Sequence, residues 1–192
     1  MKLETRWLVI WMLSTENPMS VIKAYHAGQL QEIESFIATN DRSGIKPSRS
    51  SNWLGSGVYF WENDPERAET WQAQQRKGAI LECEIDTNDL FNLLQKENAT
   101  DEFYLEVQKH SKTVKSQNNR SQQQFNLDND VFNQIQTSAF GKTKYGIRMA
   151  FYMGNSVTLD GNLFANQHIQ LCIWNTDIII NPRKYIPGRL DL

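Results

Sequence analysis

The chain has 192 residues, a length that suits a single hydrophobic core, so residues 1–192 are expected to form one domain. Apolar residues make up 40% of the chain and charged residues 22%, a composition that excludes an intrinsically disordered protein. The formal net charge is −2, so the chain as a whole lacks the excess of positive charge that a broad nucleic-acid surface requires.

Cysteine content and apolar runs point to a compartment. Cys83 and Cys172 lie far apart, which excludes a disulfide framework or a Cys-x-x-Cys metal site and favours the reducing cytoplasm. No apolar run approaches the roughly 20 residues of a membrane-spanning helix, so no membrane partner is expected.

Residues 1–18 are expected to be an extension of the domain. Residues 7–13 are apolar, but no small-x-small cleavage site follows them. We interpret this run as a buried or docking strand, or as an upstream extension if translation starts at Met19. Secretion is the less favoured interpretation.

The first predicted elements are a strand over 21–25 and a helix over about 29–39, in which apolar residues recur on one face. A polar loop over 40–52 and a short strand over 58–60 follow. The acid, proline and second acid at 64–66 are a strong helix start, and this helix is expected to run to about Lys77 and to end at Gly78.

Alternation over 80–85 predicts a half-buried strand with Glu82 and Glu84 on its outer face. The remaining predicted elements are helices over 102–109 and 129–137 and strands over 148–153 and 168–174. Short strands and a few helices without regular β-α alternation indicate an α+β fold.

Residues 96–128 are expected to be a polar, basic insertion. Within it, residues 107–124 contain four basic residues and no acid, and we predict an exposed, mobile loop there. This loop can follow a phosphate backbone, with Lys142, Lys144 and Arg148 extending the surface, although a solvated loop explains the composition equally well. Arg148 has a second interpretation, in which it pairs with a buried acid.

Three segments carry candidate chemistry. Residues 53–60 combine Gly55 and Gly57 with Tyr59, so a planar ligand can approach the backbone and stack on the ring. The segment is neither a Walker loop nor a dinucleotide fingerprint, and a glycine turn before a core strand explains it equally well. His26 follows a predicted strand. In the predicted strand over 168–174, alternation places Ile169, Leu171 and Ile173 on one face and Gln170, Cys172 and Trp174 on the other. His26 and Gln170 are each more often structural when considered alone.

The order of these segments resembles ADP-ribosyltransferases of the diphtheria-toxin and poly-ADP-ribose-polymerase clade, whose signature is His, Tyr and Glu on three strands. The similarity covers roughly residues 20–181 and includes His26, the Gly-x-Gly-x-Tyr-Phe segment and Gln170. Small bacterial members with a Trp-Leu-Gly-x-Gly-x-Tyr-Phe-Trp-Glu segment are the most similar. The resemblance implies split antiparallel β-sheets with flanking helices.

The resemblance also implies NAD as a co-substrate, without a metal, and assigns residue roles. His26 would bind the adenine-side ribose, main-chain groups at Ala27 the nicotinamide carboxamide, and Tyr59 the nicotinamide ring, with Trp71 on the other face of the ring. The predicted catalytic residues are His26, Tyr59 and Gln170. The predicted cofactor-binding residues are Tyr25, His26, Ala27, Gly28, Gly55, Ser56, Gly57, Tyr59 and Trp71.

Three positions depart from the family pattern. Ala27 replaces a glycine, Arg67 a serine and Gln170 the signature glutamate. Because an amide is neither a base nor an anion, either the acceptor is already nucleophilic or catalysis is lost; we expect activity, without polymer formation. Glu62 and Asp160 are spare acids, each more often a solvated carboxylate.

The resemblance implies a mono-ADP-ribosyltransferase acting on RNA, DNA or protein, and an intracellular bacterial toxin with an antitoxin partner or a role in phage defence. The alternative from the same fold is an inactive module that binds NAD, ADP-ribose or a partner. An RNA 2′-phosphotransferase ranks lower because its Arg and His constellation is missing. A metal hydrolase ranks lowest because His26, His110 and His168 are scattered.

Overall fold

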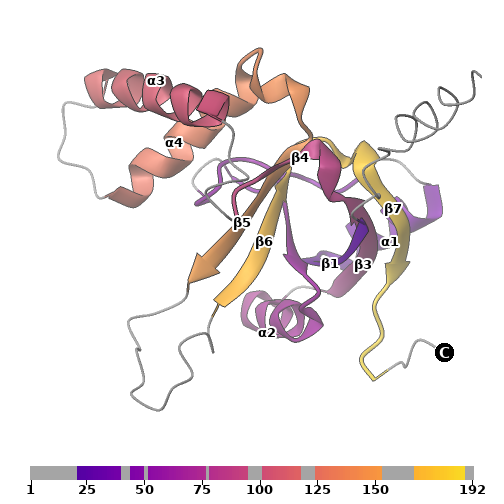
Figure 1. The fold of residues 1–192 in the computed structure, drawn as a ribbon. Helices are drawn as coiled ribbons and strands as arrows, with labels where there is room; N and C mark the ends of the chain where they lie inside the picture. Colours follow the sequence, from indigo (N-terminus) through magenta and orange to yellow (C-terminus); the bar gives the residue numbers. More distant parts are fainter. Residues whose placement is uncertain are drawn as a thin grey trace, which may run out of the picture.

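Figure 1 shows the computed structural model of the chain, which describes residues 21–39, 44–49, 52–76, 78–94, 101–117, 124–152 and 167–188. The elements in these ranges are β1 (Val21–Gly28), α1 (Leu30–Thr39), β2 (Val58–Glu62), α2 (Pro65–Gln75), β3 (Ala79–Asp86), β4 (Leu90–Asn92), α3 (Asp101–Gln117), α4 (Gln124–Thr137), β5 (Gly146–Tyr152), β6 (Gln167–Ile173) and β7 (Ile179–Lys184). The predicted extension over 1–18, Met19 and Asp160 lie outside the described residues.

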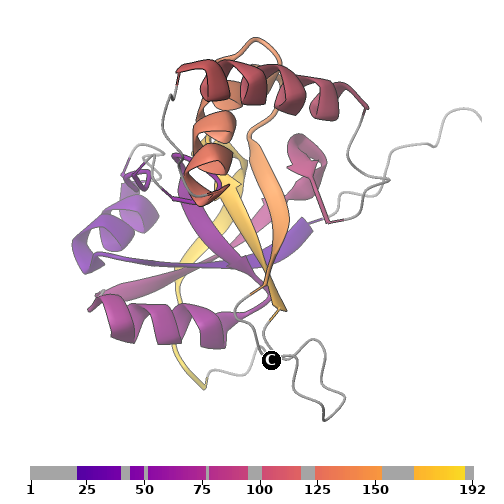
Figure 2. The same cartoon turned by 90° about the vertical axis from the view of Figure 1, so that its left-hand side faces the viewer.

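The strands form one curled sheet in the order β4-β5-β6-β2-β1-β3-β7 (Figure 2). Neighbouring strands are antiparallel except β4 and β5, which are parallel. The α+β class is therefore confirmed, whereas the expected split into two antiparallel sheets is wrong. The β2–β6 ladder makes the sheet continuous, and the long connection through α3 and α4 allows β4 and β5 to run in parallel.

The two helices predicted in the first half of the chain are confirmed. Helix α2 begins where the sequence predicted, because the Asp64 side chain accepts a 2.9 Å hydrogen bond from the backbone N–H of Arg67 and Pro65 occupies the first turn. It ends at Gln75, after which Arg76 adopts a left-handed conformation with a φ of 51°. The helix therefore stops slightly before the predicted end at Lys77.

Replacement of Asp64 by alanine is expected to lower the free energy of unfolding by about 0.5–2 kcal/mol, because the N–H of Arg67 loses its acceptor. Asp64→Asn is the matched control, since its side-chain oxygen still caps the helix. Urea unfolding of both variants measures the difference. Equal stability of the two variants would contradict this role for the cap.

The polar segment after residue 100 is more ordered than predicted. Residues 101–117 form α3, so the helix predicted over 102–109 is confirmed and is longer than expected. The mobile loop expected over 107–124 is wrong for residues 107–117, and residues 118–123 lie outside the described part. Helix α3 packs against α4 (Figure 1) and buries Phe103, whose ring lies 5.1 Å from that of Phe91. One apolar face is enough to anchor a helix whose other faces are polar.

The sheet buries apolar side chains on both faces. On one face, α1 covers a core that includes Phe36, Phe60 and Leu171, here called the α1 core. On the other face, Tyr25, Ala27, Trp61, Ala68 and Ile80 form the α2 core. Beside it lies the α3–α4 core, which contains Leu54, Phe91, Phe103, Val131, Ile135, Ile147 and Cys172.

The alternation predicted for β6 is confirmed, because Leu171 and Ile173 enter the α1 core whereas Cys172 enters the α3–α4 core. Strand β6 is an inner strand, paired with β2 on one side and β5 on the other. Among the described helices, none has the length and apolarity needed to cross a membrane.

Candidate functional site

The three predicted catalytic residues lie on three adjacent strands. His26 is on β1, Tyr59 on β2 and Gln170 on β6, and β2 lies between the other two strands. The ladder places Trp61 between Tyr25 on β1 and Gln170 on β6. Residues that are far apart in the sequence are thus brought to the centre of one sheet.

The side chains of these residues leave the sheet in two directions. Tyr59 and Trp61 share one face of β2, and Gln170 lies opposite Trp61 on the same face. The His26 ring lies instead beside that of Phe60, with ring centroids 5.4 Å apart. It contacts the Tyr59 position through the backbone, where its Nδ1 lies 2.8 Å from the carbonyl oxygen of Tyr59.

This contact decides where His26 carries its proton. A carbonyl oxygen only accepts, so Nδ1 of His26 is the donor and Nε2 of the neutral ring offers a lone pair. A Cβ added at Gly28 would lie 3.0 Å from Nε2 of His26 and 3.2 Å from Ile33. Glycine at position 28 therefore leaves room beside the imidazole.

Tyr59 holds the glycine loop with its hydroxyl group. The hydroxyl donates a 2.9 Å hydrogen bond to the carbonyl of Gly55 and accepts one of 2.9 Å from the N–H of Leu54. Burial raises the pKa of Tyr59 far above its usual range, so the group remains protonated. The hydroxyl is thus occupied by the protein, and the half-buried ring packs against the α3–α4 core.

Sequence reasoning missed Asn133, on α4. Its Oδ1 accepts a 2.8 Å hydrogen bond from the N–H of Ser56 and would lie 2.8 Å from a Cβ added at Gly55. Gly55 also has a φ of +82°, a conformation that favours glycine. The loop over 55–57 is thus tied to a helix 77 residues away, and no local signal could have identified that partner.

Two partners of Gln170 were also missed. Its Oε1 accepts a 2.7 Å hydrogen bond from the indole Nε1 of Trp53, and its Nε2 lies 2.9 Å from Nε2 of His168. His168 had a signal in the sequence, because residues i and i+2 of a strand share a face. Trp53 had none, because it lies 117 residues from Gln170.

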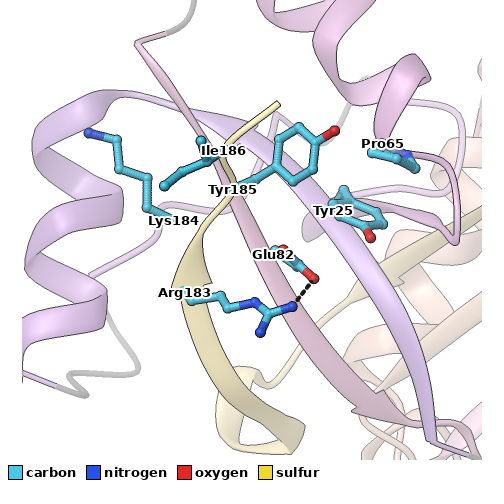
Figure 3. Close-up of a pocket in the computed structure, with 7 residues that line it drawn as sticks. All are labelled: Tyr25, Pro65, Glu82, Arg183, Lys184, Tyr185 and Ile186. Carbon is cyan, nitrogen blue, oxygen red and sulfur yellow. Dashed lines mark hydrogen bonds and ion pairs between the residues drawn. The ribbon is translucent and has the colours of Figure 1, made fainter. Parts of the chain in front are cut away.

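Tyr25 belongs to the α2 core, and Trp71 packs against Trp61 of that core. Trp71 is 43% exposed and packs on Trp61, with ring centroids 5.9 Å apart. Tyr25 packs edge-on against Tyr185 at 5.5 Å and lines a small pocket with the Glu82–Arg183 ion pair (Figure 3). The sequence resemblance predicts that Trp71 covers the second face of a nicotinamide ring stacked on Tyr59. The ring contact of Trp71 in the structure is with Trp61 instead.

Glu62 is not a spare solvated acid. Its carboxylate forms a two-point ion pair with the guanidinium of Arg148, including a 2.6 Å bond from Nε, and the two side chains are only 7% and 15% exposed. Glu62 and Arg148 lie on β2 and β5, on either side of β6. The interpretation of Arg148 as the partner of a buried acid is confirmed, and its guanidinium is not free for a phosphate backbone.

Within the described ranges, no three His, Cys, Asp or Glu side chains gather as metal ligands would. The polar groups that could hold a cofactor are those of the glycine loop, His26 and Gln170. Comparison with protein-family models, curated proteins and solved structures found no match to this chain.

Proposed function

We propose that the protein is an NAD-dependent mono-ADP-ribosyltransferase that transfers ADP-ribose to a macromolecule and releases nicotinamide. The observation that carries this proposal is the placement of His26, Tyr59 and Gln170 on the adjacent strands β1, β2 and β6, where the His26 ring binds the Tyr59 carbonyl and the side chains of Tyr59 and Gln170 share the opposite face of the sheet. The same three positions carry the sequence resemblance, so two independent observations point to one region.

Each group has a role suited to its geometry. The lone pair on Nε2 of His26 accepts from a ribose hydroxyl, and main-chain groups at Ala27 hold the carboxamide of nicotinamide. The ring of Tyr59 supports the pyridine ring. Gln170 uses one lone pair of Oε1 and one N–H on the protein and keeps one of each for the other ribose.

The acids near the site limit the acceptor. Glu62 is paired with Arg148, Glu82 is paired with Arg183, and Asp64 caps α2 by accepting from the N–H of Arg67. A neutral amide at position 170 removes no proton, so the acceptor must attack with an electron pair that is already available, as an aromatic nitrogen, a thiolate, a phosphate or a carboxylate does. The acceptor forms a bond to C1′ of the ribose while the C1′–N bond breaks. The electron pair of the broken C1′–N bond leaves with nicotinamide, which is released as a neutral molecule.

The test is incubation of the purified protein with NAD labelled in the adenine and with cell extract, followed by digestion with nuclease or protease. We expect label in a macromolecular fraction, and release of that label by one of the two digestions identifies the class of acceptor. Complete retention of the label in free NAD would contradict transfer. Within this proposal the protein is a cytoplasmic bacterial toxin, held by an antitoxin or used against phage.

A second candidate is a module that binds NAD or ADP-ribose without chemistry. The observation in its favour is that Gln170, neutral in place of the signature glutamate, has both ends of its amide already bound by Trp53 and His168. Calorimetric binding of NAD without release of nicotinamide would select this candidate. Release of nicotinamide that depends on Gln170 would select the transferase.

A further inference from the structure

The amide of Gln170 is held at both ends by groups from different parts of the chain. Trp53, in the turn before β2, donates to its carbonyl, whereas His168 meets its nitrogen from the same face of β6. His168 is only 5% exposed. The three side chains therefore form a chain of contacts that includes a buried imidazole.

The direction of each hydrogen bond in this chain follows from donor and acceptor chemistry. An indole N–H only donates, so the oxygen of the Gln170 amide must face Trp53. The amide nitrogen then faces His168, and because it too only donates, Nε2 of His168 must offer a lone pair. The imidazole is therefore neutral, with its proton on Nδ1.

The surroundings of His168 favour this neutral form. Burial lowers the pKa of His168, the guanidinium of Arg67 on α2 lowers it further, and the carboxylate of Asp64 raises it. The register partner of His168 on β5 is the uncharged Phe151. Among the described residues, the charged groups that act on His168 are thus Arg67 and Asp64, both from the start of α2.

We propose that His168 is a positioning residue for the reaction: as a neutral imidazole it accepts from Gln170 and, together with Trp53, holds the amide in one orientation toward the ribose. This inference rests on the proposed function for its catalytic consequence. It explains how a neutral amide can serve at a position where the family pattern has a carboxylate. The orientation is supplied by two protein groups and does not depend on charge.

Acidification breaks this arrangement. A proton on Nε2 of His168 would point an N–H at the N–H of Gln170, so two donors would face each other and the amide would lose its fixed orientation. Because the folded state disfavours the charged imidazole, the unfolded state binds the proton first as the pH falls below about 6.5. Stability is thus unaffected above that pH and decreases as the pH falls toward the lower pKa of folded His168.

The same geometry predicts the effect of restoring the signature residue. In Gln170→Glu, a carboxylate oxygen would face the lone pair of His168, and only uptake of a proton by His168 would turn this contact into a hydrogen bond. We therefore expect this variant to raise the pKa of His168. We do not expect the exchange to increase activity at a pH above this raised pKa, where His168 is neutral.

The structural part of the proposal is tested by NMR on the full chain with 15N-labelled histidine, tryptophan and glutamine. We expect the proton of His168 on Nδ1 at pH 7.5, and a common titration midpoint for His168, the Trp53 indole and the Gln170 amide on acidification. A proton on Nε2 of His168 at pH 7.5 would overturn the proposal. So would a Gln170 amide signal that does not change as His168 titrates. This experiment needs no turnover of NAD.

The catalytic part is tested by the pH profile of nicotinamide release. His168→Gln keeps an acceptor oxygen near the place of Nε2 but does not titrate, so the acidic decline of kcat should disappear while the neutral rate is retained. His168→Leu removes the acceptor, and kcat should fall by about five- to tenfold at neutral pH. His110→Gln, on α3 outside the site, is the matched control and should keep the wild-type decline.

The outcomes separate the two proposals. A wild-type acidic decline in His168→Gln, or an unchanged kcat in His168→Leu, would refute the positioning role of His168 in an active enzyme. If no form of the protein releases nicotinamide, the proposed function and the catalytic role of His168 both fail. The NMR titration then still decides whether His168 and Trp53 orient Gln170.

Discussion

Replacement of either partner of the Glu62–Arg148 pair is expected to lower the free energy of unfolding by about 3–5 kcal/mol, because it leaves a buried charge without its counter-charge. Glu62→Gln is the sharpest variant, since it keeps the shape of the side chain and removes only the charge. Arg148→Met leaves the carboxylate of Glu62 alone. Urea unfolding at neutral pH measures both losses.

Two comparisons make this result specific. The double variant Glu62→Leu/Arg148→Met replaces both charges by apolar groups and should recover most of the stability. Lys184→Met breaks the exposed pair of Lys184 with Glu34, whose side chains are 48% and 54% exposed, and should cost less than about 1 kcal/mol. A loss in Glu62→Gln no larger than that in Lys184→Met would contradict a buried ion pair across β6.

The second large effect concerns Tyr59. Tyr59→Ala is expected to reduce nicotinamide release by about 100-fold or more, because the ring that supports the pyridine and the hydroxyl that holds the loop are both lost. Tyr59→Phe separates these contributions. It keeps the ring but leaves the carbonyl of Gly55 and the N–H of Leu54 without the hydroxyl, at a cost of about 1–3 kcal/mol of stability.

Activity and stability must be measured on the same preparations. Tyr104, on α3, is 39% exposed, and Tyr104→Ala is the matched control that should retain both properties. If Tyr59→Ala remains folded and keeps the wild-type rate, the ring does not support the nicotinamide and the proposed site is misplaced. If Tyr59→Phe keeps the stability of the wild type, the hydroxyl does not hold the loop.

The elements that sequence patterns located share a local cause. Asp64 and Pro65 start α2 because capping and proline geometry act within one helical turn. Strand β6 was identified by alternating apolar residues, and the pleat alone separates the face of Leu171 from that of Cys172. Such signals lie within a few residues, so they are visible before folding.

Sequence patterns predicted the first part of α3, over 102–109, but missed its continuation to Gln117 and the single sheet, and both of these depend on distant partners. The residues of α3 are mostly polar, and its helix is stabilised where Phe103 meets Phe91 and where α3 packs against α4. The single curled sheet results from the pairing of β2 with β6, whose residues are more than one hundred positions apart. Pairings of this length leave no pattern in either strand.

The features of the candidate site also fall into those that local sequence determined and those that distant contacts decided. The sequence by itself determined the residue types at the three positions, including the neutral Gln170, and the alternation that places Gln170 and His168 on one face of a strand. Only the tertiary structure decided that Asn133 and Tyr59 hold the glycine loop, that Trp53 meets Gln170 and that Glu62 is bound to Arg148. The physical reason is that residue chemistry and pleat are local properties, whereas hydrogen-bond partners are set by which distant strands and helices pack together.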